Sequence, residues 1–77
     1  MKTIENNECL IEFGKFIKRG REQKNLYQTE VAEQLGVTQA YYSRIESGQR
    51  NVDLVMAMKI CSILGLKIND YIREYME

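Results

Sequence analysis

The chain has 77 residues, of which 44% are hydrophobic and 29% are charged, and this balance predicts one folded domain rather than two domains, a disordered tail or a fibre. It contains no histidine and only two cysteines, Cys9 and Cys61, so we expect no metal site and no cofactor. The formal net charge is zero, but residues 13–50 carry seven cations against four anions, which favours local attraction of phosphates.

Apolar residues recur at helical spacing along the chain, which together with the absence of proline predicts an all-α fold. The first helix is expected from about Cys9 to Gln23, after a polar N-terminal tail at residues 1–8. Phe13 and Ile17 are four residues apart and would therefore lie together on the inner face of this helix.

Two short helices follow, separated by a tight connection. The earlier one covers about residues 28–35 and ends at Gly36, which can adopt the positive φ of a helix C-terminus. The later one begins after Thr38, a favourable N-cap, and ends before Gly48. Since only Gly36, Val37 and Thr38 separate them, the two helices must pack at a steep angle, which is the geometry of a helix-turn-helix.

Two further helices complete the prediction. Asp53 is another N-cap candidate and would start a helix that continues to Leu64 and stops at Gly65. A fifth helix is expected over about residues 68–76. The sequence therefore predicts one five-helix domain at residues 9–77.

The helix after Thr38 is expected to have one apolar and one polar face. At about 100° per residue, Tyr42 and Ile45 fall opposite a polar face that is free to enter the major groove of DNA. Gln39 can pair with both edge groups of adenine, Arg44 with both acceptors of guanine, and the Ala40 methyl suits the thymine methyl. These three residues are predicted to read bases.

A family resemblance rests on residues 28–48, which read QTEVAEQLGVTQAYYSRIESG. This segment closely resembles the helix-turn-helix of the phage-repressor family, also called the xenobiotic-response-element family. The resemblance extends over about residues 13–73 and implies the five-helix fold of lambda repressor and a DNA-binding regulator of transcription. Within the family, the segment 50–52 and the short length are similar to controller proteins of restriction-modification systems, with a free-standing phage-type repressor as the alternative.

The resemblance also implies roles outside the reading face. The glutamine that opens the first helix of the motif grips the DNA backbone in this family, and later positions add phosphate contacts. The predicted backbone-contacting residues are Gln28, Tyr41, Ser43, Ser47 and Arg50. Arg21 and Glu46 match positions that form a partly buried ion pair between the first helix and the end of the third.

Some positions depart from the family pattern. Tyr27 stands where Ser, Thr or Asn usually caps the second helix, so one amide of that helix is expected to lose its partner. Gly20 stands where a large aliphatic residue is usual. We expect Tyr42, which is larger than the usual Ile or Val, to fill the space beside Gly20.

Surplus apolar residues near the C-terminal end predict a partner, because so small a core cannot bury all of them. A second copy is the simplest partner. The interface is expected to be formed by the last two helices, over about residues 53–76, through Val55, Met56, Ile63, Tyr71, Ile72 and Tyr75. The resulting homodimer would bind a palindromic operator in double-stranded DNA.

The alternative function is an interaction module of the antitoxin type, which neutralises a partner protein and binds DNA secondarily. The zero net charge and the apolar C-terminal residues favour it.

An enzyme is not expected, because no acid–base pair, metal cluster or phosphate loop is present. No apolar run approaches the roughly 18 residues of a membrane span, and residues 1–12 lack the apolar region of a secretion signal. We therefore expect a cytoplasmic protein with reduced thiols and no membrane role.

Overall fold

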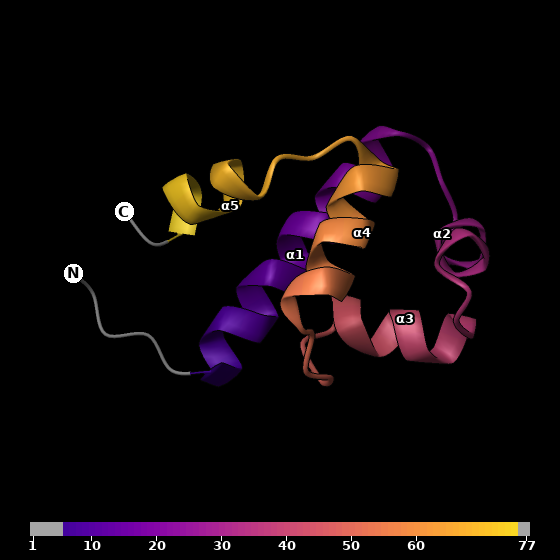
Figure 1. Ribbon diagram of the computed structural model, residues 1–77, viewed down its shortest axis with the longest axis horizontal. Helices are drawn as coiled ribbons and strands as arrows, with labels where there is room; N and C mark the ends of the chain where they lie inside the picture. Colours follow the sequence, from indigo (N-terminus) through magenta and orange to yellow (C-terminus); the bar gives the residue numbers. More distant parts are fainter. Residues whose placement is uncertain (1–5, 76–77) are drawn as a thin grey trace.

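The computed structural model describes residues 6–75, which form five α-helices and confirm the all-α prediction (Figure 1). Their bounds are Asn6–Gln23 for α1, Gln28–Leu35 for α2, Gln39–Glu46 for α3, Leu54–Leu64 for α4 and Ile68–Tyr75 for α5. The predicted tail at 1–8 is wrong for residues 6–8, which form the first turn of α1; residues 1–5, and Met76 at the predicted end of α5, lie outside the described residues. No helix within 6–75 is long and apolar enough to cross a membrane.

The helix ends follow local signals in the sequence. The Thr38 hydroxyl accepts a hydrogen bond from the Tyr41 amide (3.1 Å), and the Asp53 carboxylate accepts one from the Met56 amide (2.8 Å), so both predicted N-caps are confirmed. Gly36 ends α2 with a φ of +76°, a conformation that costs a glycine little. The chain can therefore reverse within the short connection between α2 and α3.

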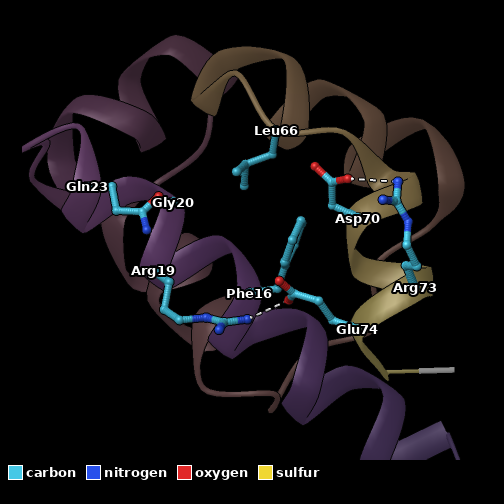
Figure 2. A pocket seen from close by; sticks show the side chains of 8 residues that line it. All are labelled: Phe16, Arg19, Gly20, Gln23, Leu66, Asp70, Arg73 and Glu74. Atoms are coloured by element: carbon cyan, nitrogen blue, oxygen red, sulfur yellow. Dashed lines mark hydrogen bonds and ion pairs between the residues drawn. The ribbon is translucent and has the colours of Figure 1, made fainter. Parts of the chain in front are cut away.

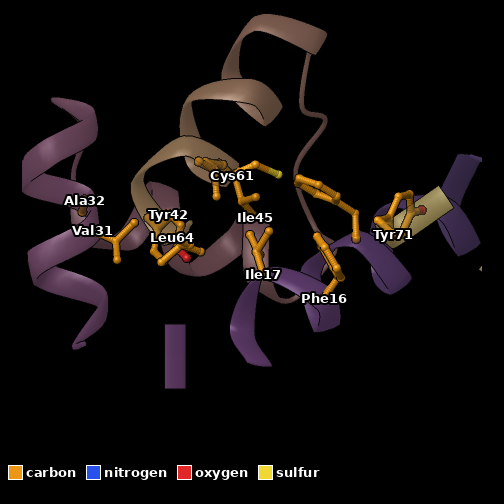
Figure 3. Close-up of a cluster of buried hydrophobic side chains, with 11 residues drawn as sticks. Phe16, Ile17, Val31, Ala32, Tyr42, Ile45, Cys61, Leu64 and Tyr71 are labelled. Atoms are coloured by element: carbon orange, nitrogen blue, oxygen red, sulfur yellow. The ribbon is translucent and has the colours of Figure 1, made fainter. Parts of the chain in front are cut away.

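The hydrophobic core lies around α1, which packs on α3, α4 and α5, and α2 closes it by packing on α3 and α4 (Figures 1 and 3). Its members are Phe13, Phe16, Ile17, Val31, Ala32, Tyr42, Ile45, Ile60, Cys61, Leu64 and Tyr71. Every helix contributes at least one of them, so the five helices share one core.

Tyr71, which was predicted for the dimer interface, is mainly a core residue of the single chain. Its side chain is only 6% exposed. Its ring packs edge-on against Phe13, with 5.5 Å between ring centroids, and also contacts Phe16 at 5.6 Å. Tyr71 therefore attaches α5 to α1 within one chain, and only its small accessible part, at the wall of an apolar hollow, is left for a second molecule.

Two glycines of α1 mark close approaches of other elements. A Cβ at Gly14 would lie 2.2 Å from the backbone oxygen of Glu46, so α1 and the end of α3 can pack only through a glycine there. A Cβ at Gly20 would lie 2.6 Å from Leu66 Cδ1. Leu66, which follows α4, therefore occupies the space beside Gly20 (Figure 2), and the prediction that Tyr42 fills it is wrong.

Candidate nucleic-acid interface

The polar face of α3 lies at the molecular surface, opposite the core. The three predicted base-reading residues, Gln39, Ala40 and Arg44, are all exposed. Among the predicted backbone contacts on the same helix or just after it, Ser47 and Arg50 are exposed and Ser43 is half-buried. The structure thus places these side chains where a DNA groove could reach them.

The Arg21–Glu46 ion pair predicted from the sequence is present and well buried. Arg21 Nε lies 2.6 Å from Glu46 Oε2, and Arg21 Nη2 donates to Glu46 Oε1 at 3.1 Å. Only 11% of the Arg21 side chain and 3% of the Glu46 side chain are exposed. A third Arg21 donor, Nη1, bonds the Leu26 carbonyl at 2.8 Å, so the pair joins α1, α3 and the segment before α2.

The same carboxylate also holds Gln28, a connection that the sequence analysis missed. Gln28 Nε2 donates to Glu46 Oε1 at 3.0 Å, and Gln39 Nε2 donates to Gln28 Oε1 at 3.4 Å. A hydrogen-bond chain therefore runs from the buried ion pair to the first residue of the exposed reading face. No spacing in the sequence signals it, because Gln28 and Glu46 meet only through the packing of α2 on α3.

Glu46 remains ionised because its partners outweigh its burial. Burial alone would raise the pKa of its carboxyl, but the hydrogen bonds from Arg21 and Gln28, with the charge of Arg21, lower that pKa below its usual value. The Arg21 pKa is raised, first by its hydrogen bond to Glu46. The lowered pKa of Glu46 stabilises the fold above the unfolded-state pKa of about 4.3, and this contribution is lost as the pH falls through the folded-state value.

Tyr27 replaces the usual capping residue of α2, but the Gln28 side chain is still held in place. The Tyr27 side chain makes no cap hydrogen bond. Instead the Glu30 carboxylate accepts a hydrogen bond from the Tyr27 amide at 2.8 Å, and Gln28 is held by Glu46. The first turn of α2 is therefore fixed by acidic side chains rather than by a capping hydroxyl.

Tyr41 and Arg50 form a second pair that the sequence analysis did not anticipate. The guanidinium carbon of Arg50 lies 4.6 Å from the centroid of the half-buried Tyr41 ring. This distance is typical of a cation–π contact. The two residues were both predicted to contact the DNA backbone, and the structure brings Arg50, which follows α3, over the ring of Tyr41 in the first turn of α3.

Both α4 and α5 carry exposed apolar side chains. These are Leu54, Val55, Met58 and Ile72, and we call them together the α4–α5 surface. Val55 is 61% exposed and Leu54 is 70% exposed. Met56, Ile63 and Tyr75, also predicted for the dimer interface, are half-buried and pack partly against the core.

Metal binding and cysteine chemistry add no further candidate site among residues 6–75. Among residues 6–75, no group of three or more His, Cys, Asp or Glu side chains is placed to hold a metal ion. Cys9 is half-buried, and Cys61 is a buried core residue whose thiol pKa is raised by burial. Cys61 therefore acts as a small hydrophobic side chain.

Comparison with known proteins agrees with this arrangement. A family model described as helix-turn-helix matches residues 17–71 of the chain, which include α2, α3 and the Arg21–Glu46 pair. The chain belongs to this helix-turn-helix family. It is 40% identical over 65 residues to the control protein C.MunI of Mycoplasma sp, covering 83% of this chain and 88% of that protein.

Two solved structures of helix-turn-helix proteins resemble the whole fold. The restriction-modification controller protein C.AhdI from Aeromonas hydrophila matches with a TM-score of 0.78 and 29% identity, over 88% of this chain and 99% of C.AhdI. The clp gene regulator ClgR from C. glutamicum matches with a TM-score of 0.79 and 26% identity, over 86% of each chain. The five-helix arrangement is thus shared along nearly the full length of C.AhdI.

Proposed function

We propose that this helix-turn-helix protein is a sequence-specific DNA-binding regulator of transcription, of the restriction-modification controller kind, that binds a palindromic operator as a homodimer. The observation that carries the proposal is the exposed polar face of α3, with its first residue, Gln39, tied through Gln28 to a buried ion pair. The names of C.MunI and C.AhdI support the controller assignment. The role is regulatory rather than enzymatic and belongs in the cytoplasm, where the DNA is.

In this proposal the two kinds of contact come from different residues. Gln39, Ala40 and Arg44 read base edges in the major groove, where each base pair presents a distinct pattern of donors, acceptors and methyl groups. The backbone contacts come from Gln28, Tyr41, Ser43, Ser47 and Arg50. The cation–π contact to Tyr41 supports a phosphate-binding role for Arg50, because it limits the positions that its guanidinium can take.

The homodimer is proposed to form through the α4–α5 surface. Leu54 lies at the edge of an apolar hollow between α1, α4 and α5 that is also lined by Phe13 and Ile68. Exposed apolar side chains beside an apolar hollow are suited to an isologous contact, in which each copy offers both features. Val55 and Ile72 remain in the proposed interface because both are exposed; Met56, Ile63 and Tyr75 would contribute only their accessible parts.

The assignment of roles is tested with an operator that the unmutated protein selects from random duplex DNA. Each variant is titrated against this operator and its single-base variants at several salt concentrations. Arg44→Ala is expected to lose about 1–3 kcal/mol on the operator and to relax the preference at one base pair per half-site. Arg50→Ala is expected to weaken all sequences and to lower the salt slope by about one unit per site occupied. If Arg44→Ala instead loses affinity equally for all sequences and shows a shallower salt dependence, Arg44 contacts phosphate, and its assignment to base reading is wrong.

A further inference from the structure

The Tyr42 hydroxyl is a buried polar group that the fold and the proposed contacts leave unexplained. Its side chain is 0% exposed, and among the described residues its hydroxyl is the buried side-chain polar atom that makes no regular hydrogen bond. An unsatisfied buried hydroxyl costs about 1–3 kcal/mol. A phenylalanine would fill nearly the same volume without this cost, so the hydroxyl is the part of this side chain that packing does not account for.

The carboxylate of Glu46 lies about one helical turn after Tyr42 on α3. Residues four apart are neighbours on a helix surface, and helical side chains point toward the N-terminus, so Glu46 extends back toward Tyr42. Hydrogen bonding to Glu46 adds to burial in raising the pKa of Tyr42, although the contact lacks regular hydrogen-bond geometry.

The Glu46 carboxylate has room for one more donor. It accepts three hydrogen bonds, from Arg21 Nε at Oε2 and from Arg21 Nη2 and Gln28 Nε2 at Oε1. An ionised carboxylate offers about four lone-pair sites. Oε1 already accepts two hydrogen bonds, from Arg21 Nη2 and Gln28 Nε2. The remaining lone-pair site is therefore on Oε2, which accepts only from Arg21 Nε.

We propose that Tyr42 is a positioning residue for DNA readout, with its hydroxyl donating the fourth hydrogen bond to Glu46. With Oε2 held by Tyr42 and Arg21, Oε1 faces Gln28, and the Gln28 carbonyl in turn faces the Gln39 amide. Tyr42 thus acts on the base contact of Gln39 through two intervening side chains. This proposal rests on the proposed function for its effect on DNA, but not for the hydrogen bond itself.

A DNA-independent experiment tests the hydrogen bond. Tyr42→Phe removes only the hydroxyl, and the carboxyl signal of Glu46 followed by NMR should titrate at a higher pH, because the ionised form loses a donor. The Gln28 side-chain amide signals should shift in the same variant. Tyr71→Phe is the matched control: it removes another core hydroxyl, which donates to the Cys9 carbonyl at 3.0 Å, and should leave both signals unchanged. An unaltered Glu46 titration in Tyr42→Phe overturns the proposal.

A binding experiment tests the consequence for readout. Tyr42→Phe is expected to bind the selected operator about three- to tenfold more weakly, with the loss concentrated at the base pair read by Gln39. In a Gln28→Ala background the same change should have no further effect, because the connection is already cut. A uniform loss, or full additivity with Gln28→Ala, contradicts the positioning role. If the unmutated protein selects no sequence, the proposed function fails, and the Glu46 titration still decides whether Tyr42 holds the carboxylate.

Discussion

The α2–α3 face and the α4–α5 surface differ in how their exposed side chains are held. On the α2–α3 face, Gln28 and Gln39 are linked by hydrogen bonds to an ion pair that is buried in the same chain. On the α4–α5 surface, Leu54 and Val55 expose apolar side chains to water. Under the proposed function, this difference means that the reading face is prepared within one chain, whereas the apolar surface would be completed by a second molecule.

The largest expected effect is on the buried ion pair. Glu46→Ala leaves the Arg21 guanidinium without its carboxylate and should lower the free energy of unfolding by about 3 kcal/mol or more. Glu74→Ala is the matched control, because it breaks the exposed Arg19–Glu74 pair, whose N–O distance is 2.9 Å. Exposed pairs contribute about 0–1 kcal/mol. Urea unfolding measures both variants, and a loss below about 0.5 kcal/mol for Glu46→Ala would show that the face does not depend on this pair.

The next largest expected effect on stability compares two glycines of α1. Gly14 faces the end of α3, and Gly20 faces Leu66 after α4. Gly14→Ala forces a methyl group against the backbone of Glu46 and should cost about 2 kcal/mol. Gly20→Ala meets only the end of the Leu66 side chain, which can rotate, and gains about 1 kcal/mol of helix propensity. We therefore expect Gly20→Ala to be nearly neutral in thermal unfolding. Equal losses of stability for the two variants would show that the close approach of the Glu46 backbone to Gly14 does not limit the residue at that position.

The smallest expected effect on folding, but a decisive one for assembly, is at the α4–α5 surface. Val55→Asp places a charge on an exposed residue and should change the free energy of unfolding by less than about 0.5 kcal/mol. It should nevertheless convert a dimer at tens of micromolar into a monomer in sedimentation. Tyr27→Asp, which alters a similarly exposed residue beside α2, should leave the mass unchanged. An unmutated protein that sediments as a monomer would contradict the homodimer and leave this surface to a different protein, as an antitoxin requires.

The local part of the fold could be predicted because its signals are local. Thr38, Asp53, Gly36 and Gly65 set helix ends through bonds and dihedral angles within a few residues, and all four were interpreted correctly. The start of α1 was missed because the polar residues before Cys9 carry no apolar spacing. A helix turn without a buried face leaves no pattern to detect.

The tertiary part was predicted less well because it depends on which residues meet across the fold. The spacing of Tyr71 and Ile72 on α5 does not indicate which of them faces α1, so the burial of Tyr71 in the core was missed. The partner of Gly20 is Leu66, distant in sequence, and not Tyr42. The Arg21–Glu46 pair was correctly predicted only through the family resemblance. Its link to Gln28 required the packing of α2 on α3.

The central claim is that a homodimer reads DNA with two α3 faces, and selection of bound sequences from random duplex DNA tests it most directly. We predict enrichment of two inverted half-sites whose centres are about one helical turn, roughly 34 Å, apart. Repeating the selection with Gln39→Ala should relax one position in each half-site and leave the spacing unchanged. No enrichment, or a single motif without an inverted repeat, would contradict the account.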